Sequence, residues 1–178
     1  MRHDTLWAPW RLAFLQGLPA DAGAGGDDYP DFLAAYWEHP ELDAEQLVVY
    51  RDEMGMIVLN RYPYANGHLL VALGEGRPTI TDYEPAKRAA FWHLVEVGAA
   101  LIRHALSPQG INYGINEGHA AGAGLPGHLH AHLVPRWGGD TNFLTVIGST
   151  RVIPDSLQRM AEVYTTSLPA VLESENRK

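Results

Sequence analysis

Residues 128–134 have the sequence His128-Leu129-His130-Ala131-His132-Leu133-Val134, in which histidine alternates with apolar residues. Successive side chains of an extended strand point to opposite faces of a sheet. The pattern therefore predicts a strand over residues 128–134, which Pro135 ends. The leucine and alanine side chains are expected to face the core, and the three imidazoles to share the opposite face.

Three interpretations of this histidine face are open. The first is a solvated polar surface. The second is a metal site made by two of the rings and a remote ligand such as His68 or His119, because His128 and His132 would lie about 13 Å apart on a regular strand. The third is covalent and acid–base chemistry at phosphorus, since imidazole is a nucleophile near neutral pH and also a proton donor. Crowded imidazoles depress one another's pKa, which favours a neutral ring beside a cationic one.

The residues on either side of the histidine strand suit phosphate binding. A loop rich in glycine and alanine precedes the strand, with the sequence Asn116-Glu117-Gly118-His119-Ala120-Ala121-Gly122-Ala123-Gly124. Backbone N–H groups in such loops can approach an anion closely, so Gly122 and Gly124 are candidate phosphate contacts. Arg136 follows the strand and is either a cation for a polyphosphate or an ordinary surface arginine.

The composition limits the classes of protein. The 178 residues fit one domain, and 46% hydrophobic with 19% charged residues is typical of a globular chain. Without cysteine the chain has no disulfide, thiol nucleophile or cysteine-bound zinc, which fits a reducing compartment. The net charge of −8 argues against binding nucleic acid. No apolar run is long enough to span a membrane, and the N-terminus does not resemble a secretion signal, so we expect a soluble, cytoplasmic protein.

The remaining patterns favour an α+β fold with a mostly antiparallel sheet, one long helix and a C-terminal helix. The long helix is expected to have Asp82 as its N-cap and Pro85 in its first turn, and to end before Pro108. A C-terminal helix is expected from about Asp155, with Pro169 near its end. The other expected elements are an extended segment at 6–11, a loop at 17–30, a helical turn at 31–37, a hairpin at 47–50 and 56–59, strands at 68–73 and 111–115, and a loop at 116–127.

These residues resemble the histidine triad (HIT) family, whose signature alternates three histidines with apolar residues. Four further segments share the resemblance: Leu6 to Arg11, Leu59-Asn60-Arg61-Tyr62-Pro63 followed by Gly67-His68-Leu69-Leu70-Val71, Asn116-Glu117-Gly118, and Pro135 to Phe143. The last of these is most similar to the bacterial branch that includes diadenosine tetraphosphate phosphorylases. The resemblance covers nearly all of the chain after residue 47, together with its opening.

The resemblance implies a single HIT-like domain over 1–178, with an N-terminal extension and loop at 1–46, a nucleotide-binding core at 47–137 and a C-terminal segment at 138–178. It implies a homodimer with a continuous sheet, a small nucleotide as substrate and no cofactor. His130 would attack the α-phosphorus, and His132 would contact the phosphate and assist the leaving group. His128 and His68 would hold His130 in its tautomer and orientation. The implied nucleotide contacts are Asn60 with ribose, Asn116 with the α-phosphate and Ile57 with the base.

The chain departs from the family pattern in two places. Many bacterial relatives carry a zinc-binding cysteine pair near the N-terminus, whereas this chain has no cysteine, so no structural zinc is expected. The family places glutamine or serine before the nucleophile, where this chain has Gly124-Leu125-Pro126-Gly127.

The leading hypothesis is an enzyme that cleaves dinucleoside polyphosphates or related conjugates, with water or phosphate as acceptor. The alternatives are a nucleotide sensor or adaptor without turnover and a metal-dependent phosphohydrolase.

Overall fold

The computed structural model describes residues 31–140, 153, 155–175 and 177. The extended segment expected at 6–11, the loop expected at 17–30 and the end of the segment from Pro135 to Phe143 lie outside the described residues. The histidine strand, the long helix and their connections all lie within them.

Five strands form one sheet with the order β1-β2-β3-β5-β4, and every neighbouring pair is antiparallel. The strands are β1 (Val48–Arg51), β2 (Gly55–Leu59), β3 (Leu69–Leu73), β4 (Gly110–Ile115) and β5 (His130–Arg136). In the predicted β1–β2 hairpin, Asp52 accepts hydrogen bonds from the N–H groups of Met54 and Gly55, which closes the turn. The α+β class and the antiparallel sheet predicted from the sequence are confirmed.

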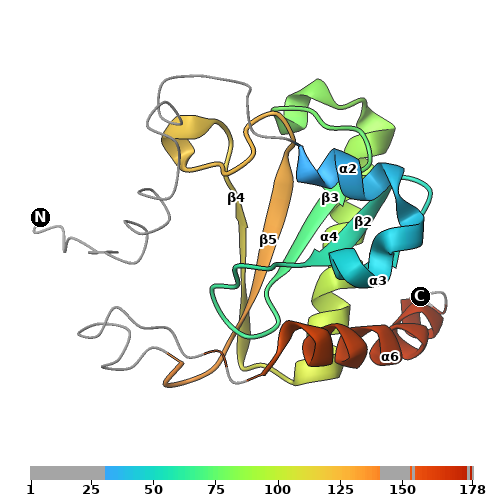
Figure 1. Ribbon diagram of the computed structural model, residues 1–178, viewed down its shortest axis with the longest axis vertical. Coiled ribbons are helices and arrows are strands. Elements are labelled where there is room, and N and C mark those ends of the chain that lie inside the picture. The colour runs from blue at the N-terminus through green and yellow to red at the C-terminus, as the bar shows by residue number, and fades with distance from the viewer. Residues whose placement is uncertain (1–30, 141–152, 154, 176, 178) are drawn as a thin grey trace, which may run out of the picture.

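Helices cover both faces of this sheet (Figure 1). The long helix α4 (Pro85–Leu106) and the C-terminal helix α6 (Leu157–Glu175) pack together on one face, and the short helix α2 (Phe32–Glu38) lies on the other. The shorter elements are α3 (Asp43–Gln46) and the 3-10 helices η1 (Pro40–Leu42), η2 (Ile80–Asp82) and η3 (His119–Ala121). None of the helices formed by the described residues has the length and hydrophobicity that a bilayer crossing requires.

Strand alternation divides the core into two clusters. Ile57, Val71 and Ala131 are paired across β2, β3 and β5, and they pack under α4 and α6. Val58 and Leu70 are paired on the opposite face, where they pack against Leu33 of α2. His130 lies opposite Ala72 and His132 opposite Leu70, so both histidines belong to the face that α2 covers.

The histidine strand differs from its prediction at both ends. It begins at His130, so His128 precedes it, and it continues through Pro135 to Arg136. The proline is tolerated because β3 pairs with β5 only as far as Leu133, and beyond that point β4 is the one neighbour among the described residues.

Two helix predictions also need correction. Asp82 does not cap α4, because its side chain makes a capping box with Thr79 in η2, and α4 starts at Pro85 after Glu84. Helix α6 does not end near Pro169 but continues to Glu175. The helical turn predicted at 31–37 is confirmed as α2, with Asp31 as its N-cap.

Gly67 fixes the end of the connection between β2 and β3. Its φ of +77° lies in the left-handed region that disfavours residues with a side chain. Its carbonyl accepts a 2.6 Å hydrogen bond from the buried Tyr164 hydroxyl of α6. A Cβ at this position would lie 2.6 Å from the same hydroxyl oxygen. The backbone next to His68 is therefore hydrogen-bonded to α6, and it has a left-handed conformation that glycine adopts without strain.

We expect Gly67→Ala to lower the free energy of unfolding by more than about 2 kcal/mol, because left-handed strain and overpacking add together. Urea denaturation measures this. Gly110→Ala is the matched control, since a Cβ there meets no atom within 4 Å. Equal stability losses in the two variants would contradict the assignment.

Candidate functional site

Four histidines lie along the neighbouring strands β3 and β5. His130 and His132 lie on β5, His68 immediately precedes β3, and His128 lies two residues before β5. His68 and His128 are fully buried, and His130 is 6% exposed. The interpretation as a solvated polar surface is therefore wrong.

A backbone carbonyl fixes the tautomer of His130. Its Nδ1 lies 2.9 Å from the carbonyl oxygen of His128. A carbonyl only accepts hydrogen bonds, so Nδ1 carries the proton and Nε2 keeps its lone pair in the neutral ring. Burial, together with the charge of His128, lowers the pKa of His130 below its ordinary value of 6.5. His130 is therefore a neutral imidazole near pH 7 with a free nucleophilic nitrogen.

A chain of hydrogen bonds fixes the opposite tautomer in His132. The backbone N–H of Tyr64 donates to Nδ1 of His68 over 3.1 Å, which makes that nitrogen an acceptor. Nε2 of His68 then carries the proton and donates to Nδ1 of His132, 3.0 Å away. His132 in turn carries its proton on Nε2.

His130 and His132 are therefore complementary neighbours. Their ring centroids lie 5.0 Å apart. Burial, and to a smaller extent His130, lowers the pKa of His132 to about 4, so this ring is also neutral near pH 7. The expectation of a cationic ring beside the neutral nucleophile on the strand is not met. Instead, Nε2 of His130 carries a lone pair, and Nε2 of the neighbouring His132 carries a hydrogen.

His128 points away from these two rings. Its Nδ1 lies 2.9 Å from the nearer carboxylate oxygen of Asp31, and its Nε2 lies 2.7 Å from the carbonyl oxygen of Leu73. The prediction that three imidazoles share one face is wrong for His128, because strand alternation starts only at His130. The expected support of His130 by the side chains of His128 and His68 also needs correction. The His128 carbonyl contacts His130, and the His68 ring contacts His132.

A hollow of about 270 Å³ lies on the histidine side of the sheet. Its aromatic and aliphatic walls come from α2, β2 and β3, and its polar groups come from the connection after β2. The lining residues are Phe32, Tyr36, Val58, Leu59, Asn60, Arg61, Tyr62 and Leu70. The Asn60 side chain is held in place, because Oδ1 accepts from the N–H of Tyr62 and Nδ2 lies 3.3 Å from Nδ1 of His68.

Ile57 does not line this hollow, which corrects the sequence-based assignment. It is fully buried in the cluster under α4, and its neighbour Val58 faces the hollow instead. Counting strand alternation outward from the histidines would have identified Val58. The walls that α2 supplies, Phe32 and Tyr36, have no equivalent signal, because their position depends on how the helix packs.

The glycine-rich loop approaches β5 from the same side as the histidines. Leu125 anchors its end in the cluster beneath α2, and the carbonyl of Leu125 accepts from the N–H of His128. Gly122 has a φ of +84°, and its carbonyl accepts from the Asn116 side chain over 3.4 Å. Gly124 faces open space. This loop therefore brings Asn116, Gly122 and Gly124 together in one segment that leads to His128.

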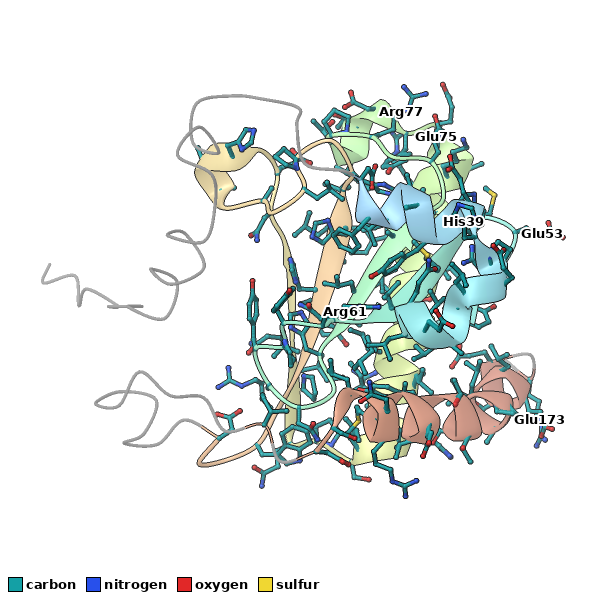
Figure 2. The ribbon with its side chains drawn as sticks, viewed as in Figure 1. His39, Glu53, Arg61, Glu75, Arg77 and Glu173 are labelled. Carbon is teal, nitrogen blue, oxygen red and sulfur yellow. The ribbon has the colours of Figure 1, made fainter. Side chains whose placement is uncertain are left out.

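Arg136 lies away from the histidine rings. Its guanidinium pairs with Asp140 and donates to Asn112, and it lies four positions after His132 on β5, a distance of about 13 Å. Arg61 is a cation nearer the hollow, as a member of its lining. Figure 2 labels Arg61, which donates to the carbonyl of Glu45 in α3 over 2.8 Å. Sequence reasoning missed Arg61, and Arg136 stays a predicted cation for a polyphosphate.

The described residues contain no group of three or more histidine, cysteine, aspartate or glutamate side chains arranged to hold a metal ion. Both ring nitrogens of His128 already face acceptors. His119 lies in the exposed helix η3. The proposed combination of His128, His130 and a remote histidine is thus not assembled among these residues.

Comparison with known proteins identifies the family. A family model described as HIT domain matches residues 41–139. The AP-4-A phosphorylase of Mycobacterium tuberculosis is 36% identical over 164 residues, which are 92% of this chain and 83% of that protein. The asymmetrical bis(5'-nucleosyl)-tetraphosphatase of Schizosaccharomyces pombe is 30% identical over half of this chain and 48% of that protein. Both relatives are named as enzymes.

A solved structure agrees with the sequence comparisons. The zinc-bound histidine triad family protein of Mycobacterium smegmatis matches with a TM-score of 0.65 and 27% identity, covering 84% of this chain and 99% of that one. The residues that the family model matches include all five strands and the four histidines. The chain belongs to the histidine triad family.

Proposed function

We propose that this chain is an enzyme that cleaves dinucleoside polyphosphates, with diadenosine tetraphosphate as the representative substrate, through a transient bond between His130 and the α-phosphorus. The observation that carries the proposal is the pair of opposite tautomers, with the lone pair of His130 Nε2 beside the N–H of His132 Nε2. Nucleophilic catalysis at phosphorus uses both groups, one to attack and one to stabilise the leaving oxygen by a hydrogen bond.

In the first step, His130 Nε2 forms a bond to the α-phosphorus, and the bond from that phosphorus to its bridging oxygen breaks. The His132 Nε2–H group donates a hydrogen bond to the bridging oxygen, which takes the electron pair of the broken bond and leaves as a phosphate oxygen of the second nucleotide. Because His68 donates to His132 Nδ1, the proton of His132 stays on Nε2 and the ring remains a hydrogen-bond donor throughout this step. Backbone N–H groups of the loop around Gly122 and Gly124, with Asn116, are suited to the phosphate oxygens.

In the second step, an acceptor oxygen attacks the phosphorus, and the bond between phosphorus and His130 breaks. Water as acceptor would give AMP and ATP from diadenosine tetraphosphate, and inorganic phosphate would give ADP and ATP. We assign phosphate, because the relative named AP-4-A phosphorylase is similar over 92% of this chain, whereas the relative named tetraphosphatase is similar over half of it.

The hollow beside α2 is suited to one nucleoside of the substrate. Phe32 and Tyr36 make an aromatic wall whose rings meet edge to face at 5.4 Å, and Val58 and Leu70 form its aliphatic floor. Asn60 is the polar group suited to ribose hydroxyls. A nucleobase gains binding free energy from aromatic and aliphatic walls, and polar groups at the rim fix its orientation.

We expect His130→Ala to lose at least about 1,000-fold in turnover of diadenosine tetraphosphate, because removal of a nucleophile leaves only the binding contribution. Product analysis with and without phosphate measures turnover and the acceptor together. Quenching of the wild-type reaction with labelled substrate in alkaline denaturant should reveal a nucleotide on the protein that acid then releases, and the variant should lack it.

His104→Ala is the control, since His104 is an exposed residue in the last turn of α4. It should retain wild-type turnover. Full activity in His130→Ala would refute the nucleophile. Saturable AMP binding without any wild-type turnover would favour the sensor or adaptor instead.

The nucleoside site can be tested independently of catalysis. Phe32→Ala removes part of the aromatic wall at a side chain that is 38% exposed, so the fold should tolerate it. We expect AMP affinity to fall about 5-fold to 100-fold, because loss of an aromatic contact to a base costs about 1–3 kcal/mol. Isothermal titration calorimetry measures the change, and Met54→Ala, an equally exposed apolar side chain in the β1–β2 turn, should leave affinity unaltered. Equal effects in both variants would argue against this hollow.

We also propose a homodimer that extends the sheet through β4. This strand ends the sheet order, and Gly110, Asn112, Tyr113 and Gly114 are exposed. An exposed strand edge readily pairs with another chain. Light scattering of the purified protein tests this, and a monomeric mass at micromolar concentration would contradict it.

A further inference from the structure

Asp31 makes two different contacts at the start of α2. Its Oδ1 accepts a 2.9 Å hydrogen bond from the N–H of Ala34, which caps the helix. The same carboxylate lies 2.9 Å and 3.1 Å from Nδ1 of His128 through its two oxygens. One side chain therefore joins the helix that lines the hollow to the residue that precedes the catalytic strand.

The surroundings of His128 favour a charged ring. Its two nitrogens face acceptors, the Asp31 carboxylate and the carbonyl of Leu73, and neither acceptor can donate a proton to the ring. Both contacts are satisfied as hydrogen bonds only if both nitrogens carry hydrogen. His128 is fully buried, so the negative charge of Asp31 is the compensation that such a ring requires.

The chain closes tightly around this ion pair. A Cβ added to Gly76 would lie 2.9 Å from Nδ1 of His128 and 3.2 Å from Oδ2 of Asp31. Next to it, the carbonyl of Arg77 accepts a 2.8 Å hydrogen bond from the N–H of Leu129. Figure 2 labels Glu75 and Arg77, which flank Gly76 in this segment after β3. The ion pair is thus enclosed by the start of α2, the segment after β3 and the approach to β5.

His128 is also the residue that orients the nucleophile. Its carbonyl accepts from Nδ1–H of His130, yet His128 lies outside the strand pairing that begins at His130. The sheet ladder therefore does not hold this carbonyl. The ring of His128 is held by its Asp31 and Leu73 contacts, and its N–H donates to Leu125. The N–H of Leu129, which belongs to the same peptide group as the His128 carbonyl, donates to Arg77.

We propose that Asp31 is a positioning residue for His130. The ion pair between Asp31 and the buried His128 ring holds the His128 carbonyl at Nδ1 of His130 and so couples the nucleoside-binding helix to the nucleophile. The expected effect on turnover rests on the proposed function, whereas the placement of the His128 carbonyl by Asp31 does not.

The ion pair also acts on the protonation of His130. The groups that face His130 are His128 before β5, His132 on β5 and Asp31 from α2, while His68 contacts His132. The hydrogen bond to the His128 carbonyl and the charge of Asp31 raise the pKa of His130, while burial and the charge of His128 lower it. Asp31→Asn changes the charge at Asp31 and the contact that holds this carbonyl, so the pKa of His130 and the acidic limb of the pH profile should shift.

Asp31→Asn separates this role from helix capping, because asparagine is an equally good N-cap. For diadenosine tetraphosphate we expect kcat to fall about 10-fold to 100-fold, the effect of a small misplacement of a reacting group. KM should change less than about twofold, and the acidic limb of the pH profile should shift. Nitrogen NMR of the histidine side chains should show two protonated nitrogens on His128 in the wild type and one in the variant.

Asp43→Asn is the matched control. Asp43 lies in α3 and pairs with Arg51 of β1, so this variant also removes an ion pair from the first part of the described chain. It should leave the pH profile, kcat and the His128 spectrum unchanged. Asp31→Ser keeps a capping side chain and removes the carboxylate, and it replaces Asp31→Asn if that protein does not fold.

Wild-type kcat and an unshifted acidic limb in Asp31→Asn would overturn the inference. So would a His128 ring with one protonated nitrogen in the wild type. If the wild type cleaves no dinucleoside polyphosphate, the proposed function fails, but the NMR comparison still decides whether Asp31 controls His128 and the Nδ1 proton of His130.

Discussion

The hydrogen bond from Nδ1–H of His130 to the His128 carbonyl is the contact on which the proposed chemistry depends. A histidine with its proton on the other nitrogen would present an N–H group, and not a lone pair, to the substrate. The carbonyl removes that choice without adding charge, and burial keeps the ring neutral. The chain from Tyr64 through His68 does the reverse for His132, by placing a donor against Nδ1. The two imidazoles therefore differ because Nδ1 of His130 faces an acceptor, the His128 carbonyl, whereas Nδ1 of His132 faces a donor, the His68 ring.

The fold supplies these partners through its antiparallel order. Because β3 and β5 are neighbours, the residue before β3 reaches His132, and the carbonyl of Leu73 at the far end of β3 reaches His128. Helix α4 fills the opposite face with apolar side chains, which leaves the face under α2 for the histidines and the hollow. The short helix α2 is central for a structure of its size. It lines the hollow with Phe32 and Tyr36, and its N-cap Asp31 contacts His128.

Much of this arrangement follows from local sequence. The alternation in residues 130–134 predicts a half-buried strand with histidines on one face, and the spacing of apolar residues predicts α4. The errors have physical causes. The sequence pattern extends the strand alternation to His128, but the strand begins at His130 and the His128 ring contacts Asp31 from another segment. Ile57 is expected at the base site, but strand alternation places Ile57 on the face under α4 and its neighbour Val58 at the hollow. The partner of His128 lies 97 residues earlier in the chain, and no local pattern of Asp31 distinguishes it from an ordinary helix cap.

Nitrogen NMR of the His130 and His132 side chains near neutral pH tests the central claim most directly, because it reports which ring nitrogen carries the proton. We expect His130 to be protonated at Nδ1 alone and His132 at Nε2 alone, both in neutral rings. A proton on Nε2 of His130, or a cationic ring at either position, would contradict the account, because no lone pair would then be available beside a donor.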